Sequence, residues 1–89
     1  QVIETVIQRL GDVQRVYLVG DFSKGMDSHI IDLIIIGNVD KAYLAKLVEK
    51  AEKLIKRKIR YLNYDDDEAS SIDWKMYAPE PLLLWSKIK

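Results

Sequence analysis

The chain has 89 residues and a mass of 10.3 kDa, enough for one small domain with one modest core. Its 14 Lys and Arg balance its 14 Asp and Glu. This balance argues against a dedicated nucleic-acid or membrane-surface binder. Cysteine is absent, which excludes disulfides, cysteine–zinc sites and thiol catalysis. No apolar run is long enough to cross a membrane and no signal peptide is evident, so a cytoplasmic protein is expected.

The first half of the chain predicts one helix followed by two strands. The ranges are residues 1–10 for the helix, and Arg15–Val19 and Ile30–Ile36 for the strands. Gly11 is expected to end the helix, and Gly20 and Gly37 to end the two strands. Residues 20–29 form a polar loop between the strands. Because the helix-like pattern starts at Gln1, we expect the chain to be a fragment of a longer protein.

The second half predicts a long helix over residues 41–56, with Asp40 as its N-cap. An apolar stripe marks the buried face of this helix: Leu44, Leu47, Val48, Ala51, Leu54 and Ile55. Two Glu-to-Lys pairs, Glu49–Lys53 and Glu52–Lys56, have the favourable i,i+4 order. A third strand is expected over Lys58–Tyr64, a short helix from the acidic run Asp65–Glu68, and an edge strand open to pairing over Leu82–Trp85.

These elements predict an α/β (α+β) domain, in which helices pack on a small mixed sheet of three or four strands. Charge is uneven along the chain: residues 41–60 carry a net charge of +6, and residues 61–80 carry −5. We interpret this mainly as a solvated helix face beside an acidic loop, with a basic ridge for phosphate or nucleic acid as the alternative.

The informative segment is Gly20–Gly37, where a strand ending in Gly-Asp, a loop with a second glycine and a strand containing one carboxylate follow each other. With the strand–helix–strand that comes next, this layout resembles the minimal nucleotidyltransferase domain of the DNA polymerase beta superfamily. The resemblance covers about residues 1–64. In that family the glycine lets phosphate approach the backbone, and two carboxylates one residue apart share divalent metal ions with a third carboxylate from a later strand.

Three positions match the family pattern. Gly20 stands at the first glycine, Gly25 at the loop glycine and Asp32 at the second metal carboxylate. The resemblance therefore implies a nucleotidyltransferase-like scaffold over the single domain 1–89.

Three positions depart from that pattern. Asp21 stands where the family has a phosphate-binding serine, Ile30 where it has the first carboxylate, and Arg60 where it has the third. We therefore expect a scaffold without the transfer chemistry, no catalytic residue, no bound metal and no cofactor. Magnesium would be expected only if the enzyme alternative held. The remnant nucleotide-site positions are Gly20, Asp21, Gly25, Asp32 and Arg60.

Asp32 lies within an apolar strand, where a carboxylate is costly unless it is paired or hydrated. We favour a structural role, either a hydrogen bond to loop amides near Gly20 or an ion pair with Lys24 or Arg60. The alternative is a surviving ligand of an old nucleotide cleft.

Other polar and aromatic residues give weaker signals. The Asp65–Glu68 run lacks calcium-loop spacing and is better explained as a helix start. His29 is the only histidine, so no histidine pair can bind metal. Trp74 and Trp85 are interpreted as core or interface aromatics.

We therefore expect a catalytically degenerate domain that acts as a regulatory, ligand-sensing or oligomerisation module of a prokaryotic transcriptional regulator. The resemblance implies contact with DNA only through a separate winged-helix module that is not in this chain. The domain could form homo-oligomers, and no membrane partner is expected. One alternative is an active metal-dependent nucleotidyltransferase that modifies a toxin or a small molecule. Another is an interaction-only domain with a ferredoxin-like fold.

Overall fold

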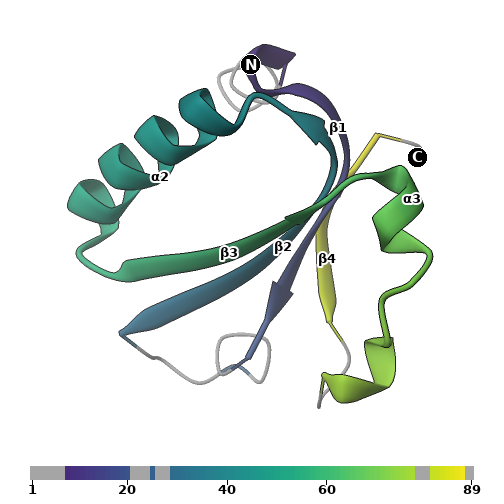
Figure 1. The fold of residues 1–89 in the computed structure, drawn as a ribbon. Coiled ribbons are helices and arrows are strands. Elements are labelled where there is room, and N and C mark those ends of the chain that lie inside the picture. Colours follow the sequence, from purple (N-terminus) through teal and green to yellow (C-terminus); the bar gives the residue numbers. More distant parts are fainter. Residues whose placement is uncertain (1–7, 21–24, 26–28, 78–80, 88–89) are drawn as a thin grey trace.

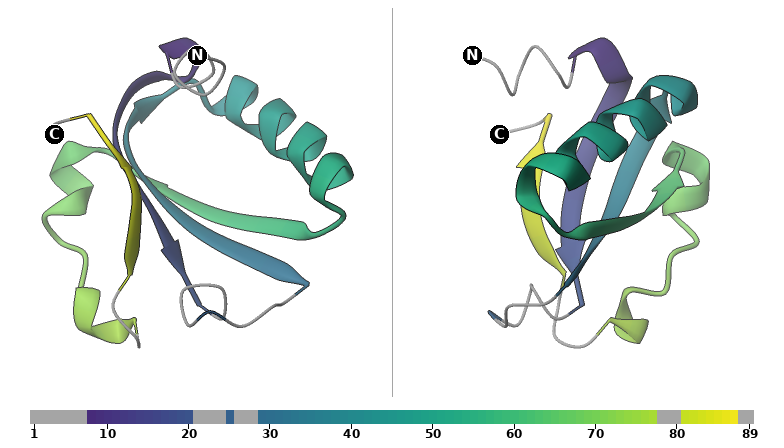
Figure 2. Two further views of the ribbon diagram at one scale, coloured as in Figure 1. Left: turned by 180° about the vertical axis from the view of Figure 1, so that it is seen from behind. Right: turned by 90° about the vertical axis from the view of Figure 1, so that its left-hand side faces the viewer.

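A computed structural model describes residues 8–20, 25, 29–77 and 81–87. Its four-stranded sheet has the order β3-β2-β1-β4, with one long helix on one face and two short helices on the other (Figures 1 and 2). The elements are β1 (Gly11–Val19), β2 (Ile30–Val39), α2 (Lys41–Ile55), β3 (Lys58–Tyr64), α3 (Asp66–Ala69), the 3-10 helix η2 (Trp74–Met76) and β4 (Leu82–Ser86). Strand β1 is antiparallel to β2 and β4, whereas β3 is parallel to β2. The predicted fold class is confirmed.

The continuous apolar sequence of β2 follows from its central place in the sheet, where both of its faces are covered. Ile34 and Ile36 are completely buried on the face of α3 and η2, and Ile35 is buried on the face of α2. This alternation fixes the register, because a shift by one residue would exchange the two faces.

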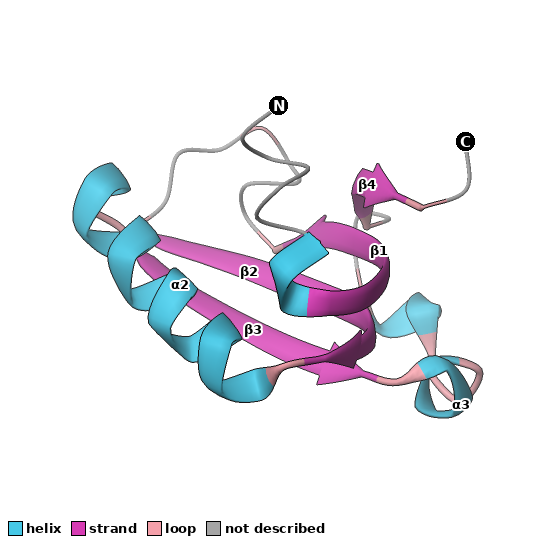
Figure 3. Cartoon of the chain, turned by 90° about the horizontal axis from the view of Figure 1, so that it is seen from above, coloured by secondary structure: helices cyan, strands magenta, loops and turns pink. Residues whose placement is uncertain are grey.

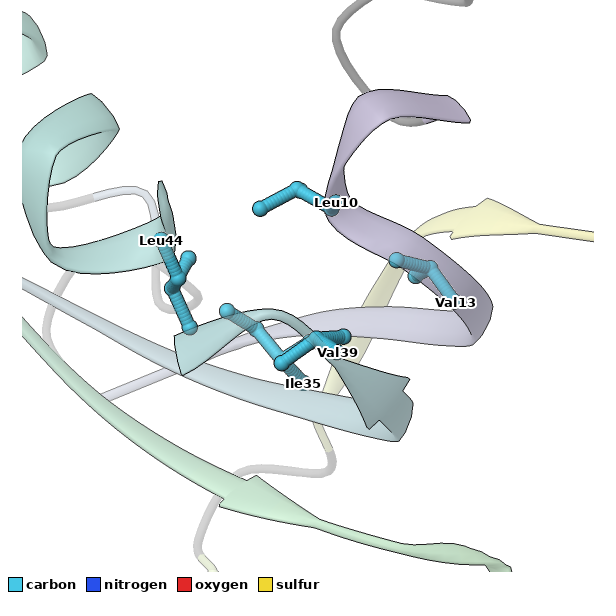
Figure 4. Close-up of a cluster of buried hydrophobic side chains, with 5 residues drawn as sticks. All are labelled: Leu10, Val13, Ile35, Val39 and Leu44. Atoms are coloured by element: carbon cyan, nitrogen blue, oxygen red, sulfur yellow. The ribbon is translucent and has the colours of Figure 1, made fainter. Parts of the chain in front are cut away.

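Two apolar cores hold the layers together. On the α2 side, five buried residues form the first core (Figure 4): Leu10, Val13, Ile35, Val39 and Leu44. On the other side, the buried residues are Val19, Ile34, Ile36 and Ala69, with Trp74 and Tyr77 of the η2 segment packed against them. Trp74 is thus a packing residue, as predicted, and its ring centroid lies 4.8 Å from that of Tyr17.

Helix α2 begins and ends close to the predicted positions. The Asp40 side chain accepts a hydrogen bond of 3.0 Å from the Tyr43 N–H, and Lys56 ends the helix in the left-handed region. The Glu49–Lys53 pair is present at 4.0 Å. The expected burial of the whole apolar stripe is wrong: Leu44 is buried, but Leu54 is 84% exposed, because the helix residues that pack in the first core come from its first half.

The first two strands are longer than predicted. β1 begins directly at Gly11, and β2 continues through Gly37 to Val39. The pairing of β1 with β2 shifts between Val13 and Arg15, which leaves an extra residue in β1 opposite Gly37. Gly37 has a φ of +141° and lets the β1 backbone come close, so it accommodates a bulge and does not end the strand.

The helix predicted over residues 1–10 lies largely outside the described residues; its last three residues are helical and lead directly into β1 (Figure 3). Gly11, with a φ of +111°, ends this turn as expected. The acidic run forms α3, with Asp65 and Glu68 in a reciprocal capping box. In the described part of the chain, every helix is too short or too polar to cross a membrane.

Candidate functional site

The candidate site lies on the sheet face that carries α3 and η2. There Asp32 of β2 stands in register between Val19 of β1 and Arg60 of β3. Ile30 is two residues before Asp32 on the same strand and therefore belongs to the same face. The sheet thus places the second expected carboxylate directly beside the position expected for the third.

Asp32 and Arg60 form a two-pronged ion pair. Arg60 Nε donates to Asp32 Oδ1 at 2.8 Å, and Arg60 Nη2 donates to Oδ2 at 3.1 Å. The hydrogen bonds to Asp32, and then its negative charge, raise the pKa of the Arg60 guanidinium above its usual value. Both oxygens of the carboxylate are therefore engaged by a permanent cation. The predicted Arg60 partner of Asp32 is confirmed, while Lys24 lies outside the described residues.

Gly20 ends β1 beside this pair. Its φ is +78°, a backbone conformation that favours glycine, and a Cβ atom added there would lie 2.9 Å from Asp32 Oδ2. The glycine thus leaves room for the carboxylate, which is a packing reason for its presence at this position.

A cavity of about 530 Å³ opens next to the pair. Its polar wall contains Asp32 and Arg60, and apolar or aromatic residues form the rest: Val19, Leu33, Ile34, Tyr61, Leu62 and Tyr77, with Gly20 at one end. Burial, and then the nearby Tyr64, raise the pKa of the Tyr77 hydroxyl, so Tyr77 stays neutral at physiological pH. The cavity can accept a ligand with an apolar body and a polar group.

Of the remaining predicted site residues, the structure describes only Gly25. Gly25 is exposed, with a φ of +77° and nothing within 4 Å of an added Cβ atom, so it shows no packing role. Asp21 lies outside the described residues. Tyr77 lines the cavity but is absent from the sequence-based prediction, because it follows η2 in a segment without periodicity and reaches the sheet only through tertiary packing.

The residues that the structure describes do not fit the divalent metal ions that the resemblance implies. The two oxygens of Asp32 already bind Arg60, Ile30 offers no ligand atom, and Arg60 would repel a cation. Residues 8–20, 25, 29–77 and 81–87 contain no cluster of three or more histidine or carboxylate side chains arranged to hold a metal. In the acidic run, Asp65 accepts the Glu68 N–H as a helix cap, consistent with the predicted helix start.

Comparison with known proteins gives structural matches alone. No protein-family profile matches the chain, and no curated protein matches its sequence. Two crystal structures of the toxin-antitoxin MntA-HpeT do match. One, with a tyrosine-to-alanine mutation, has a TM-score of 0.61 and 15% identity over 98% of this chain and 70% of that chain. The other, with two aspartate-to-glutamate mutations, has a TM-score of 0.65 and 14% identity over 98% and 71%.

At this identity the match shows the fold alone. The fold is nucleotidyltransferase-like, as the sequence predicts. The alternative of a ferredoxin-like fold is wrong, because β2, α2 and β3 form a crossover between adjacent parallel strands, whereas a ferredoxin-like sheet is built from split βαβ units.

Proposed function

We propose that this chain is a catalytically degenerate nucleotidyltransferase-like domain that acts as a ligand-sensing or oligomerisation module of a transcriptional regulator. The observation that carries the proposal is the ion pair between Asp32 and Arg60. In this pair, Arg60 binds both oxygens of the Asp32 carboxylate, which metal-dependent transfer would need for binding its cations.

Nucleotidyl transfer on this type of scaffold relies on divalent ions that orient the triphosphate and activate the attacking hydroxyl. The neighbour of Asp32 on β3 is the Arg60 guanidinium, where the family resemblance implies a carboxylate. Ile30 carries no charge. A single neutralised carboxylate is a poor metal ligand against water. The adjacent cavity keeps its apolar walls and arginine donors, which suits binding without reaction.

The proposed setting is a cytoplasmic prokaryotic regulator in which a separate winged-helix module contacts DNA. The near-neutral composition supports this division of tasks, because the domain lacks the overall positive charge of a DNA-binding surface.

The second candidate is an active, antitoxin-like nucleotidyltransferase. The observation that favours it is that both matching crystal structures come from a toxin-antitoxin pair. It would require carboxylates from the segment around Asp21, outside the described residues, to join Asp32 after Arg60 moves away.

A transfer assay separates the two candidates. The purified chain is incubated with Mg²⁺ or Mn²⁺ and each nucleoside triphosphate labelled on its α-phosphate, with the chain itself and a protein extract as acceptors. We expect the same background for the wild type and for Asp32→Ala. Metal-dependent label that disappears in Asp32→Ala would establish the enzyme instead.

Ligand binding is tested by thermal shift with nucleotides and with small aromatic carboxylates, in EDTA and in Mg²⁺. A ligand that binds the folded state raises the melting temperature by mass action. We expect at least one anionic ligand to stabilise the wild type in EDTA and to lose its effect with Arg60→Gln. A flat response across the panel would contradict a ligand-sensing role.

A further inference from the structure

We propose that the outer edge of β3 pairs in antiparallel fashion with β3 of a second copy of this chain, about a two-fold axis at Leu62. This inference does not depend on the proposed function of the Asp32 site. β3 lies at one end of the sheet order, and none of the described strands pairs with its outer side (Figure 3). An exposed strand edge presents backbone donors and acceptors that can extend the sheet into another chain.

The backbone hydrogen bonds show which residues face outward. The Lys58 N–H donates to the His29 carbonyl just before β2, so it faces inward. The next N–H, that of Ile59, donates instead to Glu52 Oε2 of α2 at 2.8 Å. Since strand backbone groups alternate in direction, Tyr61 and Asn63 also direct their N–H and C=O groups outward. Glu52 covers the start of this edge, and the part from Tyr61 onward is left for pairing.

The two ends of β3 carry opposite charges. Exposed Lys56 and Lys58 stand at its beginning, and the exposed acids of α3, including Asp66 and Asp67, follow its end. Part of the uneven charge of the sequence is therefore found at the two ends of this edge strand, while the remaining lysines of residues 41–60 lie on α2. An antiparallel two-fold places the basic end of one copy against the acidic end of the other, so the edge is electrostatically self-complementary.

The direction of the hydrogen bonds also selects the register. Placing the axis at Leu62 makes Tyr61 of one copy and Asn63 of the other a hydrogen-bonded pair, which agrees with their outward groups. In this register the beginning of β3 in one copy, with Lys58, comes near the start of α3 in the second copy, where Asp66 lies. The two Leu62 side chains, each 52% exposed in the single chain, meet on the axis at the short spacing of a non-hydrogen-bonded pair.

A second copy is a better occupant than a different partner because the same edge supplies every matching feature. Its outward backbone groups, exposed Leu62 and oppositely charged ends each find their counterpart on the β3 edge of the other copy. The contact also closes on itself: a two-fold uses up the β3 edges of both copies and stops at a dimer. The opposite edge, β4, has three half-exposed leucines but no charged residue within the strand to set a register.

The test combines sedimentation velocity with charge reversal. We expect the wild-type chain to form a dimer that weakens as salt rises to about 1 M, because the paired ends are exposed to solvent. Lys58→Glu and Asp66→Lys each place like charges near each other and should raise the dimer dissociation constant by about ten-fold or more. An equimolar mixture of the two variants should recover the dimer, because the acid introduced at position 58 of one copy then comes near the base introduced at position 66 of the other.

Two controls make the result specific. Lys75→Glu gives the same change of charge on η2, where Lys75 lines a hollow with Tyr17 of β1 and with no residue of β3, and it should leave the dimer unchanged. Leu83→Lys places a charge on the β4 edge and should also have no effect. Far-UV circular dichroism confirms that each variant is folded.

Three results would overturn the proposal: a monomeric wild type at millimolar concentration, a dimer that Lys58→Glu and Asp66→Lys leave intact, or a dimer that only Leu83→Lys disrupts.

Discussion

Gly20 lies so close to Asp32 across the first two strands that a Cβ atom added to it would lie 2.9 Å from the Asp32 carboxylate. The carboxylate is held in this place by Arg60 from the other side. A glycine that the family resemblance assigns to phosphate binding therefore also has a structural task in this chain, which is to make room for an ion pair.

The first prediction separates that contact from the general cost of a positive φ. Gly20→Ala should destabilise the fold by about 2–3 kcal/mol, from a left-handed alanine and from displacement of Asp32. Gly25→Ala has nearly the same φ but open space around the added atom, so it should cost about 1 kcal/mol. Urea unfolding measures both. Equal losses for the two variants would mean that the Asp32 contact has no effect.

The second prediction introduces carboxylates at the two positions where the family resemblance implies metal ligands. Ile30→Asp combined with Arg60→Asp creates three neighbouring carboxylates with Asp32, because residues 30 and 32 share a face and residue 60 lies beside residue 32. Mn²⁺ at about ten times its dissociation constant should then stabilise the double variant by about 1.4 kcal/mol, visible as a higher melting temperature. The wild type should show no such shift, and a wild type that responds equally to Mn²⁺ would refute the degenerate site.

The third prediction concerns the bulge opposite Gly37. An added Cβ atom would meet the Asp12 carbonyl and lie 2.9 Å from the Gln14 nitrogen, all of it backbone that cannot rotate away. Gly37→Ala should therefore cost about 3 kcal/mol or more. Gly11→Ala, whose nearest contact is a single oxygen at 3.0 Å, should cost less. Calorimetric melting temperatures test this order, which the reverse ranking would contradict.

The fourth prediction concerns acid stability. Hydrogen bonding to Lys87 Nζ at 2.9 Å lowers the pKa of Asp12 below its usual 3.8, despite a smaller opposing effect of desolvation. A lowered pKa adds stability above the unfolded-state value of about 3.8, and this stability is lost as pH falls through the folded-state pKa.

Lys87→Met should move the Asp12 pKa back toward 3.8 in an NMR titration and remove this part of the pH dependence. Stability near neutral pH should fall slightly, because the pair is exposed. An unchanged Asp12 titration in the variant would show that the pair does not form in solution.

Local patterns determined most of the elements. The apolar spacing of α2, the cap at Asp40 and the alternation of β3 each depend on neighbours a few residues away, and they were predicted correctly. The role of Gly37 cannot be predicted in this way, because the bulge that it accommodates lies in β1, more than twenty residues away in the chain. The exposure of Leu54 cannot be predicted for a similar reason: periodicity shows which face of a helix is apolar and does not show which part of that face packs in the core.

The sequence by itself determined which residue types stand at positions 30, 32 and 60, namely an isoleucine, an aspartate and an arginine, because these identities can be read directly. Only the tertiary structure decided that Arg60 takes up both oxygens of Asp32, that Tyr77 closes the adjacent cavity, and that opposite charges are divided between the two ends of one edge strand. These relationships join residues far apart in the chain, and their geometry exists only after the strands have paired.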